Sequence, residues 1–168
     1  YYVNKSSLPK VYGGFNTSLS WKGFDLSAIF AYSIGGYIYN RDITMILHNG
    51  SLEGRDWSTE ILRRWTPENR YTDVPALSTT SNNWNSASTR FLQNNSYMRL
   101  KNLTLSYNLP KQLISKLALS SVQVFVQGDN LFTVHRNQGL DPEQGITGIT
   151  YYRYPAMRTI SGGINLSF

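Results

Sequence analysis

The chain has 168 residues, no cysteine and a formal net charge of +6, and this composition excludes several kinds of chemistry. Without cysteine it forms no disulfide, no zinc–thiolate site and no cysteine nucleophile. Its sixteen Lys and Arg are scattered from Lys5 to Arg158 rather than gathered in a basic stripe, so we expect no nucleic-acid binding. Charged residues make up only 15% of the chain and aromatic residues 14%, which favours strands with neutral polar groups on one face.

Neither a membrane-spanning helix nor a secretory leader is predicted. No apolar run reaches the roughly 18 residues that a transmembrane helix needs. The chain begins Tyr1-Tyr2-Val3 without a methionine or an apolar leader segment, so we expect a mature chain or a fragment of a longer one.

The first predicted elements are two strands, near residues 11–21 and 24–34, that form a hairpin. Both alternate between apolar and small or polar residues, as a strand with one apolar face does. A two-residue turn at residues 22–23 keeps that phase and pairs Trp21 with Phe24 on the same face. Each strand is about ten residues long, which is normal for a strand that crosses a bilayer.

Residues 35–95 break this pattern and form a long loop, which should be functional or carry its own structure. Two short helices are predicted within it, over residues 41–48 and 57–65. Residues 78–95 are rich in Ser, Thr and Asn and are predicted to be irregular.

The second predicted helix places Trp57, Ile61 and Trp65 on one face, at positions i, i+4 and i+8. We interpret the three side chains as the small core of the loop itself. A docking patch for a partner protein is the alternative.

Strand character returns near residues 97–109, 120–129 and 157–168. A medium turn over residues 112–119 joins the first two of these strands. A second long loop over residues 130–155 precedes the last one.

Three details of these later strands carry information. The apolar phase slips at residues 101–102, which predicts a β-bulge; the alternative is that Leu103 and Leu105 face a protein-filled interior. Phe125 lies in the polar phase of its strand, and the alternation offers no reason for it. The last strand alternates strictly and ends with Ile164, Leu166 and Phe168 in its apolar phase.

The predicted connections alternate in length. Those after the first and third strands are short or medium, whereas those after the second and fourth are long. Because antiparallel strands put alternate connections on opposite sides, one end of the sheet is nearly bare. Short periplasmic turns opposite long extracellular loops are typical of outer-membrane barrels. About five strands cannot close a barrel, so we expect part of a longer barrel or of an assembly.

No catalytic, metal or cofactor site is predicted. His48 and His135 have no partner at a metal-ligand spacing. Asp141 and Glu143 lie in a Gly-rich loop where oxygen ligands can bind calcium, but two carboxylates are few for such a site. No phosphate-binding loop and no nucleophile elbow is present. We therefore expect that the protein is not an enzyme.

Five segments stand in a fixed order over residues 8–168: LPKVYGGFNTSLSWKGFDLSAIFAYSIGGYIYN, RRWTPENRYTDVPAL, NNSYMRLKNLTLSYNLPKQLI, VQVFVQGDNLFT and YPAMRTISGGINLSF. Each alone is a weak signal, but the ordered set is specific. It resembles the C-terminal barrel region of the SusC/RagA-type, TonB-dependent outer-membrane transporters.

The resemblance implies an all-β fold: a large transmembrane β-barrel of about 22 strands, with long extracellular loops that carry short helices. This chain would supply the last antiparallel strands, about five, and would lack the plug domain. The implied protein imports oligosaccharides or peptides across the cell outer membrane. Its implied partners are a SusD-type surface lipoprotein, TonB through a missing N-terminal part, the rest of the same barrel and outer-membrane lipid.

The resemblance also suggests roles for the candidate residues. Polar-phase residues would face the lumen and plug, with direct substrate contact as the alternative: Asp25, Ser27, Gln123, Gln127, Asp129, Asn165 and Ser167. Trp57, Ile61 and Trp65 become docking candidates for the lipoprotein, and Ile164, Leu166 and Phe168 a signal for the barrel-assembly machinery. The alternative function is a soluble all-β carbohydrate-binding module.

Overall fold

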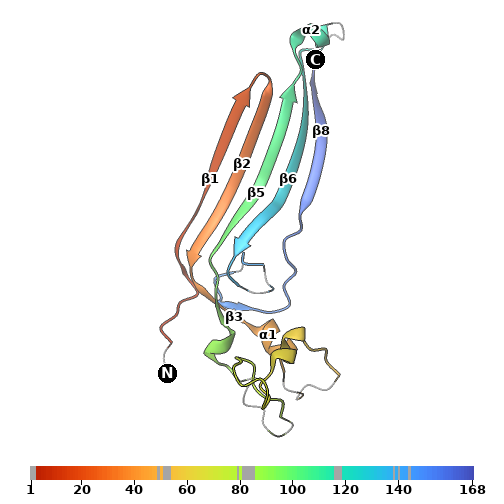
Figure 1. Cartoon of the computed structure of the whole chain (residues 1–168). Coiled ribbons are helices and arrows are strands. Elements are labelled where there is room, and N and C mark those ends of the chain that lie inside the picture. Colours follow the sequence, from red (N-terminus) through yellow and green to blue (C-terminus); the bar gives the residue numbers. More distant parts are fainter. Residues whose placement is uncertain are drawn as a thin grey trace.

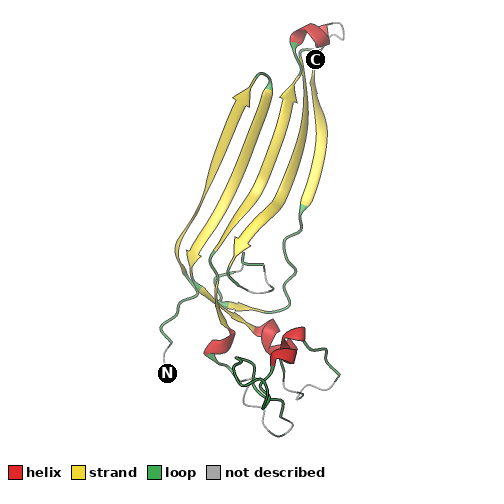
Figure 2. Ribbon diagram, in the orientation of Figure 1, coloured by secondary structure: helices red, strands yellow, loops and turns green. Residues whose placement is uncertain are grey.

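The computed structural model describes residues 3–48, 50, 54–78, 80, 86–115, 119–137, 139, 141–143 and 145–168. Their strands form a five-stranded sheet in the order β1-β2-β5-β6-β8 and a three-stranded sheet in the order β4-β3-β7 (Figures 1 and 2). Neighbouring strands of the large sheet are all antiparallel and follow one another along the chain, as in an up-and-down barrel wall.

The strands are β1 (Pro9–Trp21), β2 (Phe24–Gly35), β3 (Tyr37–Asn40), β4 (Leu92–Asn94), β5 (Tyr97–Asn108), β6 (Ser121–His135), β7 (Ile149–Thr150) and β8 (Thr159–Ser167). The helices are α1 (Arg41–Ile46), α2 (Lys111–Ile114) and the 3₁₀ turns η1 (Thr59–Arg63) and η3 (Thr89–Phe91). No helix among the described residues has the length and apolar character to cross a membrane.

The β1–β2 hairpin has the predicted register. Lys22 and Gly23 both have positive φ, 48° and 89°, which is the conformation of a type I′ turn. This turn matches the twist of the flanking strands, and it pairs Trp21 with Phe24. Further along, the rings of Phe15 and Phe30 stack with their centroids 4.7 Å apart.

The predicted bulge at residues 101–102 is confirmed. Asn102 pairs with Ile29 and Leu100 with Phe30, so Lys101 is the extra residue between them. The facing strand β6 is irregular at the same level, where Asn130 has a φ of 53°. The predicted end of this strand at residue 129 is wrong, because β6 resumes pairing beyond the irregularity and runs to His135.

The two ends of the large sheet differ. The β1–β2 turn, α2 and the C-terminal residue lie at one end, which we call the turn end (Figure 1). The opposite, loop end carries β3, α1 and the long connections (Figure 1). Residues 79 and 81–85 of the predicted irregular stretch and 116–118 of the predicted turn lie outside the described residues. The irregular stretch was predicted too long, because η3 and β4 lie near its end.

The loop end contains its own small core. The side chains that are most fully buried belong to the long connections and the small sheet: Phe91, Ile38, His48, Val74, Asn40 and Thr150. The loop of residues 35–95 therefore packs around the small sheet. By contrast, no layer of helices or strands among the described residues covers either face of the large sheet (Figure 2).

The first predicted helix is present, and the second is wrong. Helix α1 begins after Asn40, whose side-chain oxygen accepts a hydrogen bond from the Ile43 amide at 3.1 Å. At residues 57–65 there is only the short turn η1. The chain becomes extended at Arg64, and the Trp65 amide bonds to the Val74 carbonyl at 2.8 Å. This cross-loop bond competes with further helix, so Trp57 and Trp65 do not share a helical face.

Phe125 has a clear role in the sheet. Its cross-strand partner is Gly163, and a Cβ on that glycine would lie 2.9 Å from the Phe125 ring. The ring therefore covers the bare backbone of Gly163, an arrangement that compensates for glycine in a strand. The pairing is long-range, which is why the alternation within one strand does not reveal it.

Candidate functional site: the polar face of the large sheet

The two faces of the large sheet have opposite chemistry. One face, the apolar face, exposes large side chains on every strand, including Leu19, Leu26, Leu105, Val126 and Ile160 at 39–72% exposure. Such a continuous apolar surface marks an interface with a protein or a membrane. The other, polar face carries the predicted candidates Asp25, Gln123, Gln127 and Asp129.

A chain of hydrogen bonds crosses all five strands of the polar face near the turn end; we call its members, Ser20, Asp25, Asn108, Gln123 and Asn165, the polar belt. Ser20 donates to the Asp25 carboxylate, and Asn108 donates to its other oxygen at 2.7 Å. Gln123 donates to Asn108 at 3.1 Å, and Asn165 donates to Gln123 at 3.1 Å. Asn108 and Gln123 each accept from one side and donate toward Asp25, and Asn165 donates at the end of the row, so the charged carboxylate orients the whole row.

The second polar cluster lies further toward the loop end, at the level of the bulge. Asp129 accepts hydrogen bonds from Asn102 at 2.8 Å and from Gln127 at 3.3 Å. Thr104 donates in turn to the Asn102 side chain at 2.9 Å. The four predicted candidates are therefore half-buried and bonded to polar neighbours, which supports an ordered polar lining. Direct substrate contact by these residues stays a prediction.

An arginine that the sequence analysis did not single out anchors the second long loop to the polar face. The Arg99 side chain is only 4% exposed and forms ion pairs with Asp141 and, at 2.8 Å, with Glu143. Its Nε donates to Thr133 at 3.0 Å. Lys101 binds the same Glu143 carboxylate from the rim. Two strand cations thus hold two loop carboxylates.

Asp141 is the centre of this anchor. Burial raises the pKa of its carboxyl, but hydrogen bonds from the Ala156 and Glu143 amides, together with Arg99, outweigh burial and hold the pKa below its ordinary value of 3.8. The two loop carboxylates considered for calcium are thus ion-paired to protein cations. Within the described ranges, no three His, Cys, Asp or Glu side chains gather to hold a metal.

The docking candidates of the first long loop are divided between core and surface. Ile61 is buried, whereas Trp57 and Trp65 are 45% and 44% exposed. The Trp57 indole N–H donates to Nδ1 of buried His48 at 2.9 Å. That nitrogen must therefore be an acceptor, which puts the proton of the neutral imidazole on Nε2. Ile61 is a core residue, and the exposed parts of the two indoles are available to a partner.

The predicted assembly signal lies on the edge strand β8 and at the last residue. Ile164 pairs with Val124 and Leu166 with Val122, which puts both in the phase of the apolar face. All three residues, Phe168 at 90% included, are largely exposed. Their recognition by an assembly machinery stays a prediction.

The sequence contained a weak signal for Arg99. Within its strand Arg99 lies between apolar-face residues Met98 and Leu100, so alternation put a charged side chain on the polar face. In a chain with few charges, such a residue should have an acidic partner. The partner Asp141 lies 42 residues away, in a loop whose path the sequence did not reveal.

No protein-family model matches the chain, but individual proteins do. TonB-dependent receptor P3 of Formosa agariphila is 34% identical over 166 residues, 92% of this chain and 16% of that protein. TonB-dependent receptor SusC of Bacteroides thetaiotaomicron is 29% identical over 170 residues, 99% of this chain and 16% of that protein.

A solved structure agrees with these relatives. A chain of the RagAB peptide importer in its open-open state matches with a TM-score of 0.87 and 36% identity, covering 99% of this chain and 18% of that chain. This chain therefore spans about a sixth of the length of the curated relatives. It belongs to the SusC/RagA-type family of TonB-dependent receptors, and its large sheet is part of the barrel of such a receptor.

Proposed function

We propose that the chain forms barrel wall and extracellular loops of an outer-membrane active transporter, which imports oligosaccharides or peptides and is energised through TonB. The observation that carries this proposal is the large sheet itself, with one exposed apolar face, one hydrogen-bonded polar face and all long loops at one end. A wall between lipid and a wet lumen needs this combination.

The apolar face supports contact with lipid along its length. Its strands are 9 to 15 residues long, enough for tilted strands to cross a bilayer. At the turn end, Trp21, Phe24 and Tyr107 lie side by side on this face, and the Phe24 and Tyr107 rings are 4.4 Å apart. Aromatic residues at this level correspond to the interfacial girdle of such barrels.

The polar face supports a role as lumen lining. Its hydrogen-bonded clusters present neutral amides and hydroxyls, with Asp25 and Asp129 already bonded to neighbours. A lining of this kind makes contact with water, a plug or a polar cargo without an unpaired buried charge. A soluble carbohydrate-binding module is not favoured, because it would leave the whole apolar face in water.

The partner we propose is a SusD-type surface lipoprotein that contacts the loop end. The relatives include a SusC protein and a chain of the RagAB importer. Trp57 and Trp65 offer partly exposed indoles at this end of the sheet, and aromatic side chains of this kind dominate many protein interfaces.

The cargo class is tested with the full-length receptor in its native organism. We expect that deletion of its gene abolishes growth on one class of nutrient, oligosaccharides or peptides, and that loss of TonB has the same effect. Unchanged uptake of both classes after deletion would contradict the proposed function.

Lipoprotein docking is tested by co-purification from detergent-solubilised outer membranes. Trp65→Ala should reduce recovery of the lipoprotein about tenfold or more, as a contact residue in an interface does. Leu113→Ala is the control, because Leu113 is also exposed but belongs to α2 at the turn end. Equal recovery with both variants would show that Trp65 does not contact the lipoprotein.

A further inference from the structure

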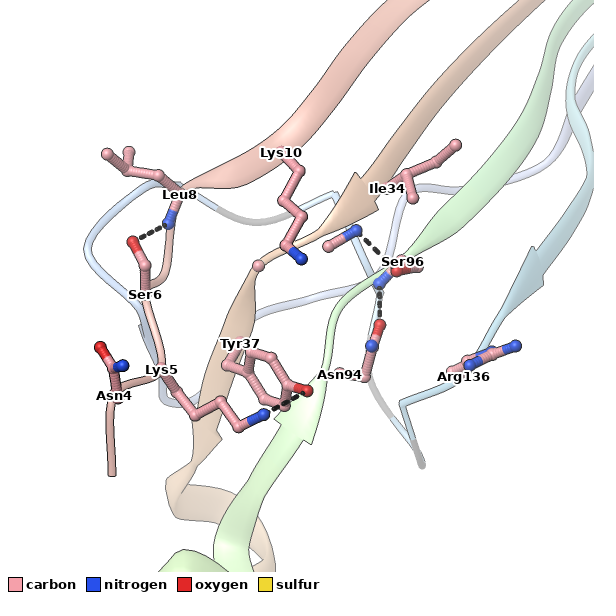
Figure 3. Close-up of a pocket in the computed structure, with 12 residues that line it drawn as sticks. Asn4, Lys5, Ser6, Leu8, Lys10, Ile34, Tyr37, Asn94, Ser96 and Arg136 are labelled. Carbon is pink, nitrogen blue, oxygen red and sulfur yellow. Dashed lines mark hydrogen bonds between the residues drawn. The ribbon is translucent and has the colours of Figure 1, made fainter. Parts of the chain in front are cut away.

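A hollow of about 510 Å³ lies at the loop end of the large sheet. Figure 3 shows the segment before β1, the end of β2, the start of β3 and the β4–β5 junction around it. Nothing in the proposed transport mechanism accounts for this hollow. Its position relative to the apolar face and its charges suggest a ligand.

The hollow continues the apolar face. Ile34 pairs with Val11 in the phase of that face, is 54% exposed, and also lines the hollow. Leu8 lines it too and is 57% exposed. Lys10 is the extra residue of a register shift between Pro9 and Val11. A ligand in the hollow therefore meets apolar side chains on the side of the sheet and polar ones toward the loops.

The charges of the hollow are all positive. Lys5, Lys10 and Arg136 line it, and no carboxylate is among the described residues that do so. The described ion pairs involve none of these three cations. Lys5 donates a hydrogen bond to the Tyr37 hydroxyl at 3.1 Å (Figure 3). This bond and the charge of Lys5, with a smaller contribution from Lys10, lower the pKa of Tyr37, as a positive potential does.

Neutral hydrogen-bonding groups complete the lining. Ser96 accepts a hydrogen bond from the Gly35 amide at 2.9 Å, which fixes its hydroxyl at the wall of the hollow. The side chains of Asn4 and Asn94 also line it. Cations and neutral donors around one space suit an oxyanion such as a phosphate group.

We propose that this hollow binds the phosphate group of an anionic lipid in the leaflet that surrounds the loop end of the sheet. The inference rests on the proposed function, because it requires the apolar face to lie in a membrane. Acyl chains would lie along that face beside Ile34, and the phosphate would contact Lys10 and Lys5. Arg136, whose side chain points away from these two lysines in Figure 3, adds positive charge at the far wall of the hollow. Basic side chains at the edge of a membrane-facing surface are a recurrent means of binding lipid headgroups.

The test uses the full-length receptor in neutral detergent and fluorescent diphosphoryl lipid A as the probe. The variant Lys5→Gln/Lys10→Gln should weaken binding about tenfold or more, since each Lys or Arg near an anionic lipid raises the affinity several-fold. Lys22→Gln/Lys111→Gln removes the same charge at the turn end and should bind like the parent protein. The charge-conserving Lys10→Arg should also bind like the parent, which separates loss of charge from loss of folding.

Inorganic phosphate serves as the competitor that distinguishes the two sources of the same chemistry. Displacement of lipid A only at a large molar excess of phosphate supports a lipid site. Competition at equal concentration would identify a site for free phosphate and overturn the proposal, as would undiminished lipid binding by Lys5→Gln/Lys10→Gln. Lipid binding by a receptor that transports neither peptides nor oligosaccharides would contradict the proposed cargo and leave this inference standing.

Discussion

The ion pairs of Arg99 are the interaction whose removal tests the structure most sharply. Arg99→Met keeps much of the length of the side chain but removes the cation that holds Asp141 and Glu143. Both Arg99 and Asp141 have side chains less than one tenth exposed. Removal of one partner from a buried pair costs about 3–5 kcal/mol, because the other charge stays buried without compensation.

The lower end of that range applies here. After the substitution Asp141 still accepts hydrogen bonds from the amides of Ala156, at 2.7 Å, and Glu143, at 2.9 Å. A loss of about 3 kcal/mol raises the population of a detached loop about a hundredfold. The Ala156 amide, which is protected by its bond to Asp141, should exchange with deuterium faster by about that factor.

Hydrogen exchange of the full-length receptor, read by mass spectrometry on peptides that contain Ala156, measures this effect. Lys101→Met is the matched control, because Lys101 binds Glu143 but has a side chain one third exposed. An exposed pair contributes about 1 kcal/mol or less, so exchange should rise less than about tenfold. Equal exchange in Arg99→Met and the parent protein would refute the anchoring of the loop by Arg99.

Four further predictions concern other parts of the chain. Since the pKa of Asp141 lies below its ordinary 3.8, its carboxylate stabilises loop docking at neutral pH, and this contribution is lost only as the pH falls below that value. The hydrogen-exchange rate of the Ala156 amide, corrected for its intrinsic rate, should therefore be constant from neutral pH down to about pH 5. A corrected rate that already increases between pH 7 and about pH 5 would contradict the assignment. Gly163→Ala should destabilise the barrel by about 1–3 kcal/mol, measured by heat-modifiable gel migration, because the added Cβ meets the Phe125 ring at 2.9 Å. Phe125→Leu in the same protein should relieve much of that cost, and strictly additive losses of stability in the double variant would refute the contact. Asn108→Leu should cost about 1 kcal/mol in the same assay by breaking the polar belt between Asp25 and Gln123, and no change would show that the belt does not stabilise the sheet. Trp57→Phe removes the shorter of two hydrogen bonds to Nδ1 of buried His48, the other being the Gly50 amide at 3.3 Å, and should cost about 1 kcal/mol of local stability. The loss is measured as faster proteolysis of residues 54–74, and parental resistance would contradict that role.

Alternation along single strands was enough to predict the large sheet. Apolar residues alternate back from Trp21 along β1 and onward from Phe24 along β2. Around a two-residue turn, only one register puts both apolar sets on the same face, and the structure has that register. The slip at Lys101 was also visible, because the extra residue inverts the phase within one strand. These features depend on residues that are close in sequence.

The features that the sequence analysis missed depend on distant contacts. Strand β6 continues past the irregularity at Asn130 because β5 is there to pair with it. Phe125 lies on the polar face because Gly163, on the next strand, leaves room for its ring. The turn η1 stops short of the predicted helix because the Trp65 amide finds the Val74 carbonyl across the loop.

The candidate site was predicted only in part, because its placement follows from local alternation whereas its hydrogen bonds join distant residues. Alternation put Asp25, Gln123, Gln127 and Asp129 on the polar face, where the structure has them. It gave no information on which polar side chains bond to one another, so the belt and the anchor around Arg99 emerged only with the strands in register. Contact of Asp25, Gln123, Gln127 and Asp129 with cargo stays a prediction.

The central claim, that the large sheet is a wall between lipid and lumen, is tested most directly by nitroxide labels along β5. In a cysteine-free background of the full-length receptor in native membranes, single cysteines replace Leu103, Thr104, Leu105 and Ser106 in turn. Dissolved oxygen concentrates in the bilayer. We therefore predict that the frequency of collisions between the nitroxide and oxygen is high for labels at 103 and 105 and low for labels at 104 and 106. Absence of this alternation, or the opposite phase, would contradict the claim.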